Sequence, residues 1–134
     1  GGLLMEAVSM ADEFLDKGVI VTVRGRVDGS SVYKAKEGGY KMPLVVLVSS
    51  DSASASEIFA GAVQDNRRGL ILGDRSFGKA SVQSLMSPFT SNGYYIKLTI
   101  ARYYAPSGRT IQVTAIHPDI QIPPAPGKPK RKAF

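Results

Sequence analysis

The chain of 134 residues contains no cysteine, a single histidine and no long apolar run. Without cysteine it can form neither a disulfide framework nor a thiolate zinc site. No apolar segment approaches the roughly 18 residues that suggest a membrane-spanning helix. The opening residues, Gly1 and Gly2, do not resemble the charged and then apolar leader of a signal peptide. A chain of this length is expected to form one domain with one core.

The formal net charge of +6 arises at the carboxyl end of the chain. The sequence has 17 Lys and Arg against 11 Asp and Glu, and four of the basic residues lie in the last seven, "KPKRKAF". Without those four the excess is two, so the rest of the chain is nearly balanced. A basic tail could bind phosphate groups. We instead expect residues 123–134 to form a Pro-rich, disordered tail, and we expect no nucleic-acid partner.

The first part of the chain predicts a helix and a strand. Apolar residues at helical spacing indicate a helix over residues 4–15. The β-branched run "VIVTVRGRV" indicates a strand over residues 19–27. Residues 28–39 are polar and contain glycine, which is typical of a loop, with room for a short edge strand. Because the sequence opens with glycines directly before a helix, with no strand leading in, we expect it to be truncated at its N-terminus.

The middle of the chain predicts a βαβ unit. The continuous apolar run "PLVVLVSS", residues 43–50, is typical of a strand buried on both faces. A helix over residues 54–68 follows, with Ile58, Phe59, Ala62 and Val63 on its inner side, and then a second short strand over residues 69–74. A helix between two apolar strands implies parallel strands and a right-handed crossover. The fold class is therefore α/β.

A β-hairpin is predicted near the carboxyl end. Two strand-like runs, residues 81–89 and 94–104, flank the turn signal Asn92-Gly93. From Pro118 onward the prolines are expected to end regular structure, which gives a domain over residues 1–122.

The stretch "SDSASASEI", residues 50–58, has two readings. Ser54 and Glu57 form the S-x-x-E pattern of a capping box at the start of an apolar helix, and capping alone would explain both residues. A serine where a buried strand turns into a helix also has the geometry for nucleophilic attack, because α/β folds place their sites at strand carboxyl ends. The helix N-terminus supplies N–H groups suited to a developing oxyanion.

A nucleophilic serine needs a base, and two residue types are available. The single histidine, His117, lies two residues from Asp119, too close in sequence for the two to orient each other as in a triad, so we expect a turn or surface role. Lysine is the base in Ser-Lys variants of the same chemistry, provided that desolvation keeps it neutral. Lys79 follows the second buried strand, so it could meet Ser54 at one edge of the sheet. The alternative is a solvated loop lysine.

Three stretches, "SASASEIFAGAVQDNRRGLILGDRSFGKASVQ", "KLTIARYYAPSGRTIQ" and "HPDI", occur in an order and spacing that resemble the carboxy-terminal processing peptidases, or tail-specific proteases. The resemblance extends from Gly1 to about Ile122. It implies a core similar to the crotonase and Clp protease superfamily. It also implies a serine endopeptidase, without cofactor or metal, that cleaves proteins near accessible C-termini. Members of the family mostly act in the periplasm, at the cell envelope or in the thylakoid lumen, so an exported protein is implied.

The resemblance also assigns the site residues. It implies that Ser54 is the nucleophile, that Lys79 is the general base and that Gln83, four residues on, orients the lysine. The oxyanion hole would use the N–H of Ala55 and one from the pair Gly1-Gly2. The residues implied to support the site are Glu57, Asp65 and Ser76.

The sequence departs from the family pattern in two respects. The strand that normally precedes the glycine pair and the upstream PDZ domain are not in this sequence, and Ala80 stands where a glycine is common. Two rival hypotheses remain open at this stage. One is a non-catalytic module that pairs with a second copy through an open sheet edge. The other is a binder of anionic surfaces that acts through "KPKRK".

Overall fold

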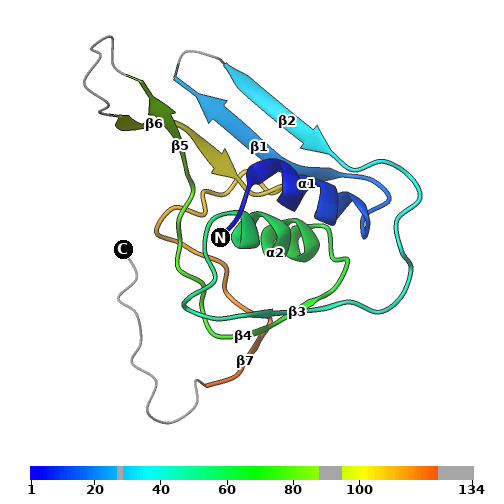
Figure 1. The fold of residues 1–134 in the computed structure, drawn as a ribbon. Helices are drawn as coiled ribbons and strands as arrows, with labels where there is room; N and C mark the ends of the chain where they lie inside the picture. The colour runs from blue at the N-terminus through cyan, green and yellow to red at the C-terminus, as the bar shows by residue number, and fades with distance from the viewer. Residues whose placement is uncertain (27–28, 88–94, 124–134) are drawn as a thin grey trace.

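The computed structural model describes residues 1–26, 29–87 and 95–123, and two sheets enclose two helices in it (Figure 1). The first sheet is antiparallel, with the order β2-β1-β6-β5. The second sheet is parallel, with the order β3-β4-β7. The strands are β1 Val19–Gly25, β2 Ser30–Lys34, β3 Val45–Val48, β4 Leu70–Gly73, β5 Ser81–Met86, β6 Ile96–Tyr104 and β7 Ile120–Gln121, and the helices are α1 Leu4–Asp12 and α2 Ala55–Asp65.

Helix α2 is the centre of the core. It lies between β1 of the first sheet and β4 of the second, and it also contacts α1. Seven of its eleven residues are buried, so it is covered on nearly every side. Small residues permit this close packing: a Cβ added to Gly61 would come within 3.3 Å of Ile116 Cδ1. Ile20 and Val21 of the first sheet, Ile71 of the second sheet and Ile111 of the segment after β6 are among the buried residues that complete the core.

The predicted βαβ unit is confirmed. Strand β3, helix α2 and strand β4 follow one another, and β3 pairs with β4 in parallel from Val45 opposite Leu70 to Val48 opposite Gly73. The carboxyl ends of both strands therefore lie at the same edge. Beyond the strands, Asp74 N–H donates to the Val48 carbonyl at 3.1 Å and Phe77 N–H donates to the Ser52 carbonyl at 2.9 Å. The segments that carry Ser54 and Lys79 are thereby held side by side.

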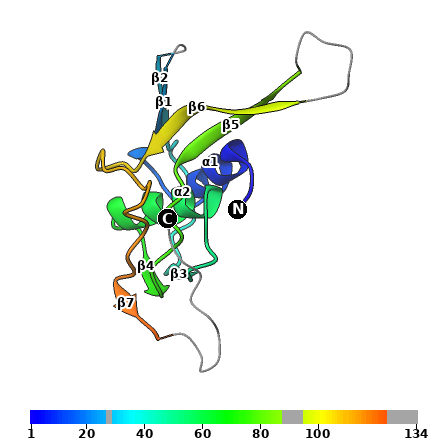
Figure 2. The same cartoon turned by 90° about the vertical axis from the view of Figure 1, so that its left-hand side faces the viewer.

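The predicted hairpin is also confirmed, as the antiparallel pair β5 and β6, which extends away from the helices (Figure 2). Its predicted turn at Asn92-Gly93 lies outside the described residues.

The short edge strand allowed for in residues 28–39 is β2, at one end of the first sheet. Helix α1 ends at Asp12, earlier than predicted, and Leu15 is buried beyond the helix. Within the described ranges, no helix is long and apolar enough to cross a membrane.

Two predictions about the second sheet are wrong. Strand β3 is not buried on both faces, since Val45 and Leu47 are 53% and 74% exposed; α2 covers one face of the sheet. Regular structure also continues past Pro118, because β7 adds to β4. Asp119 anchors this strand: its N–H donates to the Ile71 carbonyl at 2.8 Å and its Oδ2 accepts the Ile71 N–H at 2.8 Å. The proline precedes the strand and so interrupts none of its bonds.

Gly73 is expected to be essential to the parallel pair. Its φ is +126° and an added Cβ would lie 1.9 Å from the Val48 carbonyl oxygen, whereas Gly38, at φ +113°, has nothing within 4 Å. Gly38→Ala should lower the free energy of unfolding by about 1 kcal/mol through backbone strain alone. Gly73→Ala should lower it by more than about 3 kcal/mol. Urea denaturation measures both, and equal losses would contradict the predicted clash.

Candidate active site

Ser54 occupies a strained position between β3 and α2. It is the N-cap residue of the helix, and its backbone has φ +61° and ψ −120°. Such dihedrals cost a residue with a Cβ on the order of 1–3 kcal/mol, and they persist only where the surroundings impose them. Nucleophilic serines of other hydrolases sit on comparably strained strand-to-helix turns, because that geometry exposes Oγ above the sheet. The observed strain is therefore a functional signal that capping alone does not require.

The surroundings that impose this geometry centre on Glu57, which is fully buried. Its Oε2 accepts the main-chain N–H of Ser54 at 2.8 Å and of Lys79 at 2.9 Å. Its Oε1 accepts the N–H of Gly78 at 2.7 Å and the hydroxyl of Ser76 at 2.5 Å. Four donors thus satisfy a carboxylate that would otherwise be costly to bury. The capping box predicted from the sequence is present, and the same carboxylate also fixes the loop that carries the lysine.

Ser76 extends this network to the carboxyl-terminal part of the chain. Its side chain is buried, and its Oγ also accepts the Ile116 N–H at 2.7 Å. Its own N–H donates to the Ile116 carbonyl at 3.0 Å. The predicted supporting residues Glu57 and Ser76 therefore contact each other, and Glu57 binds three residues of the segment 76–79.

The structure brings Ser54, Lys79 and Gln83 to one cavity of about 280 Å³. Ser54 and Lys79 are half-buried, whereas Gln83 is exposed and follows an irregularity in the β5–β6 register. Apolar residues that include Leu4, Ile58 and Val82 line the same cavity. Within the described part of the chain, no hydrogen bond joins Lys79 Nζ to Ser54 or to Gln83. Hydrogen bonds between catalytic groups commonly tighten only when a substrate binds.

The predicted oxyanion donors lie at the N-terminus of α2. Ala55 is the first residue of the helix, where the N–H has no partner within the helix. Gly2 lines the same cavity, and a Cβ added to it would come within 3.5 Å of Ala55 Cβ. The amino group of Gly1 donates to Ser56 Oγ at 3.2 Å, so Gly1 is beside the helix start and lines the neighbouring cavity of about 300 Å³. The glycine pair is thus close to the helix end that would bind an oxyanion.

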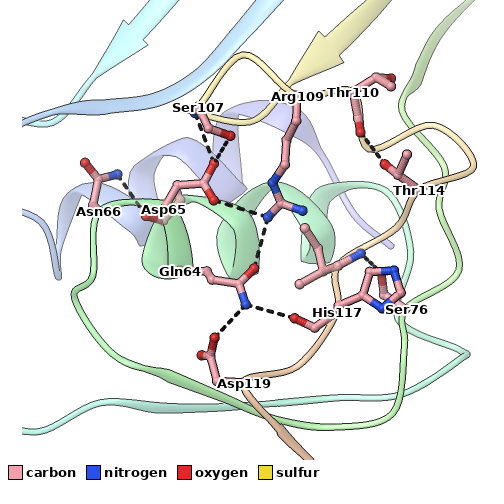
Figure 3. A network of polar contacts seen from close by, with 12 residues as sticks. Gln64, Asp65, Asn66, Ser76, Ser107, Arg109, Thr110, Thr114, His117 and Asp119 are labelled. Atoms are coloured by element: carbon pink, nitrogen blue, oxygen red, sulfur yellow. Dashed lines mark hydrogen bonds and ion pairs between the residues drawn. The ribbon is translucent and has the colours of Figure 1, made fainter.

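Asp65 lies away from this cavity, at the opposite end of α2 and about 16 Å along the helix from Ser54. Figure 3 shows its contacts: Oδ2 accepts the N–H and the hydroxyl of Ser107 at 3.0 and 2.7 Å, and Oδ1 accepts from Arg109 at 3.2 Å. It therefore holds the segment after β6. His117 is at this end of the helix too: it is exposed, and its carbonyl accepts from Gln64 at 2.8 Å. Its exposure agrees with the expected turn or surface role of His117.

Sequence reasoning missed Tyr103, which also lines the cavity. Its hydroxyl lies 3.2 Å from Ser54 Oγ and is hydrogen-bonded to the carbonyl of Lys79. Burial raises the pKa of the phenol to about 12; the hydrogen bond to Ser54 lowers the pKa, and the charge of Glu57 raises it. Strand alternation places one of Tyr103 and Tyr104 inward, but nothing in the sequence says which one meets α2.

Comparisons with known proteins indicate the family to which the chain belongs. The family model for peptidase family S41 matches residues 1–122. A carboxy-terminal-processing protease of Bartonella bacilliformis is 49% identical, with 97% of this chain and 30% of that protein covered. A tail-specific protease of Haemophilus influenzae is 37% identical, with 92% of this chain and 19% of that protein covered.

A solved structure agrees with the sequence relatives. The photosystem II D1 C-terminal processing protease matches with a TM-score of 0.81 and 38% identity, over 91% of this chain and 32% of that one. The chain spans less than a third of the length of each of these proteins. With a family match over residues 1–122 and a shared fold at this level of identity, the chain belongs to peptidase family S41.

Proposed function

We propose that this chain carries the catalytic centre of a serine endopeptidase that uses a Ser54–Lys79 dyad to cleave proteins near their C-termini. The observation that carries the proposal is the strained backbone of Ser54 at the N-terminus of α2, with its side chain in the same cavity as Lys79. A serine that served only as a helix cap would not need a φ of +61°. Family membership gives independent support for serine-type peptidase chemistry.

The reaction would follow the usual course of acyl transfer. Lys79 Nζ would act as the general base and take the proton of the Ser54 hydroxyl as Oγ attacks the substrate carbonyl carbon. The oxyanion that forms would accept from Ala55 N–H and Gly2 N–H at the positive end of α2. The protonated lysine then gives its proton to the leaving amine, and water hydrolyses the acyl-enzyme by the reverse sequence. A substrate that covers the apolar wall of the cavity would exclude water from Lys79.

Three further residues support the dyad in this proposal. Glu57 holds the main-chain N–H groups of Ser54 and Lys79, and Ser76 holds Glu57. Gln83 lines the cavity beside Lys79, and its amide carbonyl would accept a hydrogen bond from the lysine amine to aim it at Ser54. Asp65 would act on stability through the segment after β6.

The substrates proposed are proteins with accessible C-termini, in keeping with the names of the relatives. An exported location is proposed on the same basis; two relatives are named as chloroplastic. Pairing of two copies through an open sheet edge stays a prediction.

Loss of either dyad residue should abolish cleavage. Ser54→Ala and Lys79→Ala should each lower kcat/KM by about 10⁴-fold or more, because the two groups act as one unit. The assay is gel densitometry of an unstructured protein that ends in apolar residues. The protein assayed is the full-length product of the gene that encodes this chain.

Two matched variants control for substitution itself. Ser52→Ala changes another serine of the same run, and Lys36→Ala removes an exposed lysine remote from the cavity; both should keep kcat/KM within about twofold. Cleavage by Ser54→Ala at the wild-type rate would refute the dyad and leave Ser54 a helix cap.

The backbone strain at Ser54 should also affect the free energy of unfolding. Glycine adopts φ +61° without a Cβ penalty, so Ser54→Gly should be more stable than Ser54→Ala by about 1 kcal/mol, although both are inactive. Chemical denaturation of the two variants measures the difference. If Ser54→Ala were the more stable of the pair, the backbone at this position would not be strained in solution.

Glu57→Gln should damage both stability and catalysis. A glutamine amide has one oxygen and one NH₂ group, so part of it would face N–H donors that it cannot accept from. We expect the free energy of unfolding to fall by about 2–3 kcal/mol and kcat to fall with it. Glu6→Gln, on the exposed side of α1, is the control. A fully stable and fully active Glu57→Gln variant would show that the carboxylate does not organise the site.

A further inference from the structure

The hydroxyl of Tyr103 occupies a position between the two halves of the proposed dyad. Tyr103 lies on β6 with its side chain 3% exposed, so the ring is held by the core. The hydroxyl contacts Ser54 Oγ at 3.2 Å and is bonded to the main-chain carbonyl of Lys79. It therefore joins the nucleophile's side chain to the backbone of the base.

The protons available at this junction restrict how the groups are arranged. The phenol has one proton, the Lys79 carbonyl can only accept, and the Ser54 hydroxyl can donate or accept. While Tyr103 donates to the carbonyl, its oxygen can accept the Ser54 proton. When the Ser54 proton turns toward Lys79 Nζ, the phenol is able to donate to Oγ instead. In both arrangements Oγ keeps a partner, and its direction is set by Tyr103.

The main-chain N–H and the main-chain carbonyl of Lys79 each have a hydrogen-bond partner. Glu57 accepts its N–H at 2.9 Å, and Tyr103 donates to its carbonyl. Glu57 also accepts the Ser54 N–H, while Tyr103 contacts the Ser54 side chain. The Glu57 carboxylate thus fixes the two main chains, and Tyr103 contacts Oγ, to which the carboxylate makes no bond. The phenol remains protonated at neutral pH, since burial raises its pKa to about 12.

We propose that Tyr103 is a positioning residue of the peptidase, whose hydroxyl orients Ser54 Oγ relative to Lys79. This inference rests on the proposed function of the Ser54–Lys79 dyad. It predicts an effect on the chemical step: a misdirected nucleophile loses rate, while the substrate contacts elsewhere stay as they were.

The test replaces Tyr103 with Phe, which keeps the ring and removes the hydroxyl. We expect kcat to fall about 10- to 100-fold with KM changed by less than about twofold. Tyr104→Phe is the matched control: it is the same change one residue on, where the ring lies under Arg24, 4.6 Å from its guanidinium carbon. That variant should keep the wild-type kcat. Ser54→Ala and Lys79→Ala are measured in the same assay.

Each outcome separates the two claims. Wild-type kcat in Tyr103→Phe, with Ser54→Ala and Lys79→Ala inactive, overturns the role of Tyr103 and leaves the dyad. Full activity of Ser54→Ala and Lys79→Ala overturns the dyad, and the inference falls with it. If kcat fell equally in Tyr103→Phe and Tyr104→Phe, the loss would reflect a general effect on β6. That result would also overturn the role of Tyr103.

A second variant covers the case in which Tyr103→Phe does not fold. A fluorinated tyrosine at position 103 keeps the shape and the hydroxyl but makes the phenol more acidic. Since a phenolate cannot donate, kcat should decline as the pH rises through the lowered phenol pKa, at a pH where the wild-type enzyme is still active. An alkaline profile identical to that of the wild type would overturn the proposal.

Discussion

The buried carboxylate of Glu57 is the constraint on which the rest of the site depends. It is fully buried and makes no ion pair among the described residues; four hydrogen-bond donors from the chain surround it. Two of the donors belong to the backbones of Ser54 and Lys79. If the carboxylate moved, the strained turn at Ser54 and the lysine loop would both lose their anchor, and leaving the donors buried and unpaired would be costly. The position of Ser54 relative to Lys79 is thus set by one side chain on α2.

This carboxylate can reach both segments only because of the sheet behind it. Parallel pairing of Val48 with Gly73 brings the carboxyl ends of β3 and β4 together, and α2 packs closely beneath them through small residues. The strain at Ser54, of the order of 1–3 kcal/mol, is then offset by interactions distributed over the core. A rigid frame with one strained residue is the arrangement expected where geometry at a reacting atom matters more than local stability.

The sequence predicted those features that depend on neighbours along the chain. Apolar runs indicated the βαβ unit, and the S-x-x-E pattern indicated the contact between Ser54 and Glu57. The bonds from Glu57 to Ser76 and Lys79 span 19 and 22 residues and follow from strand register, which no local pattern gives. The exposed face of β3 was mispredicted because an apolar run does not show what covers it. Strand β7 was missed because two residues beside a proline carry too little pattern.

The sequence did not correctly predict the positions of Asp65 and Tyr103 relative to the site. Asp65 was implied by resemblance to lie near the site, yet eleven residues of helix separate it from Ser54 by three turns, and its contacts are with Ser107 and Arg109. Tyr103 comes from a strand far along the chain, and its role depends on which face of β6 meets α2.

The two readings of Ser54 are parts of one arrangement. As the N-cap of α2, Ser54 gives its N–H to Glu57 and lies where the positive end of the helix meets the cavity. That position places Oγ beside the N–H of Ala55, which an oxyanion would need. Because main-chain groups build this frame, the proposed function leaves the side chains of Lys79 and Tyr103 to act on Oγ and that of Gln83 to orient Lys79. Under that proposal, the helix cap provides the geometry that nucleophilic attack requires.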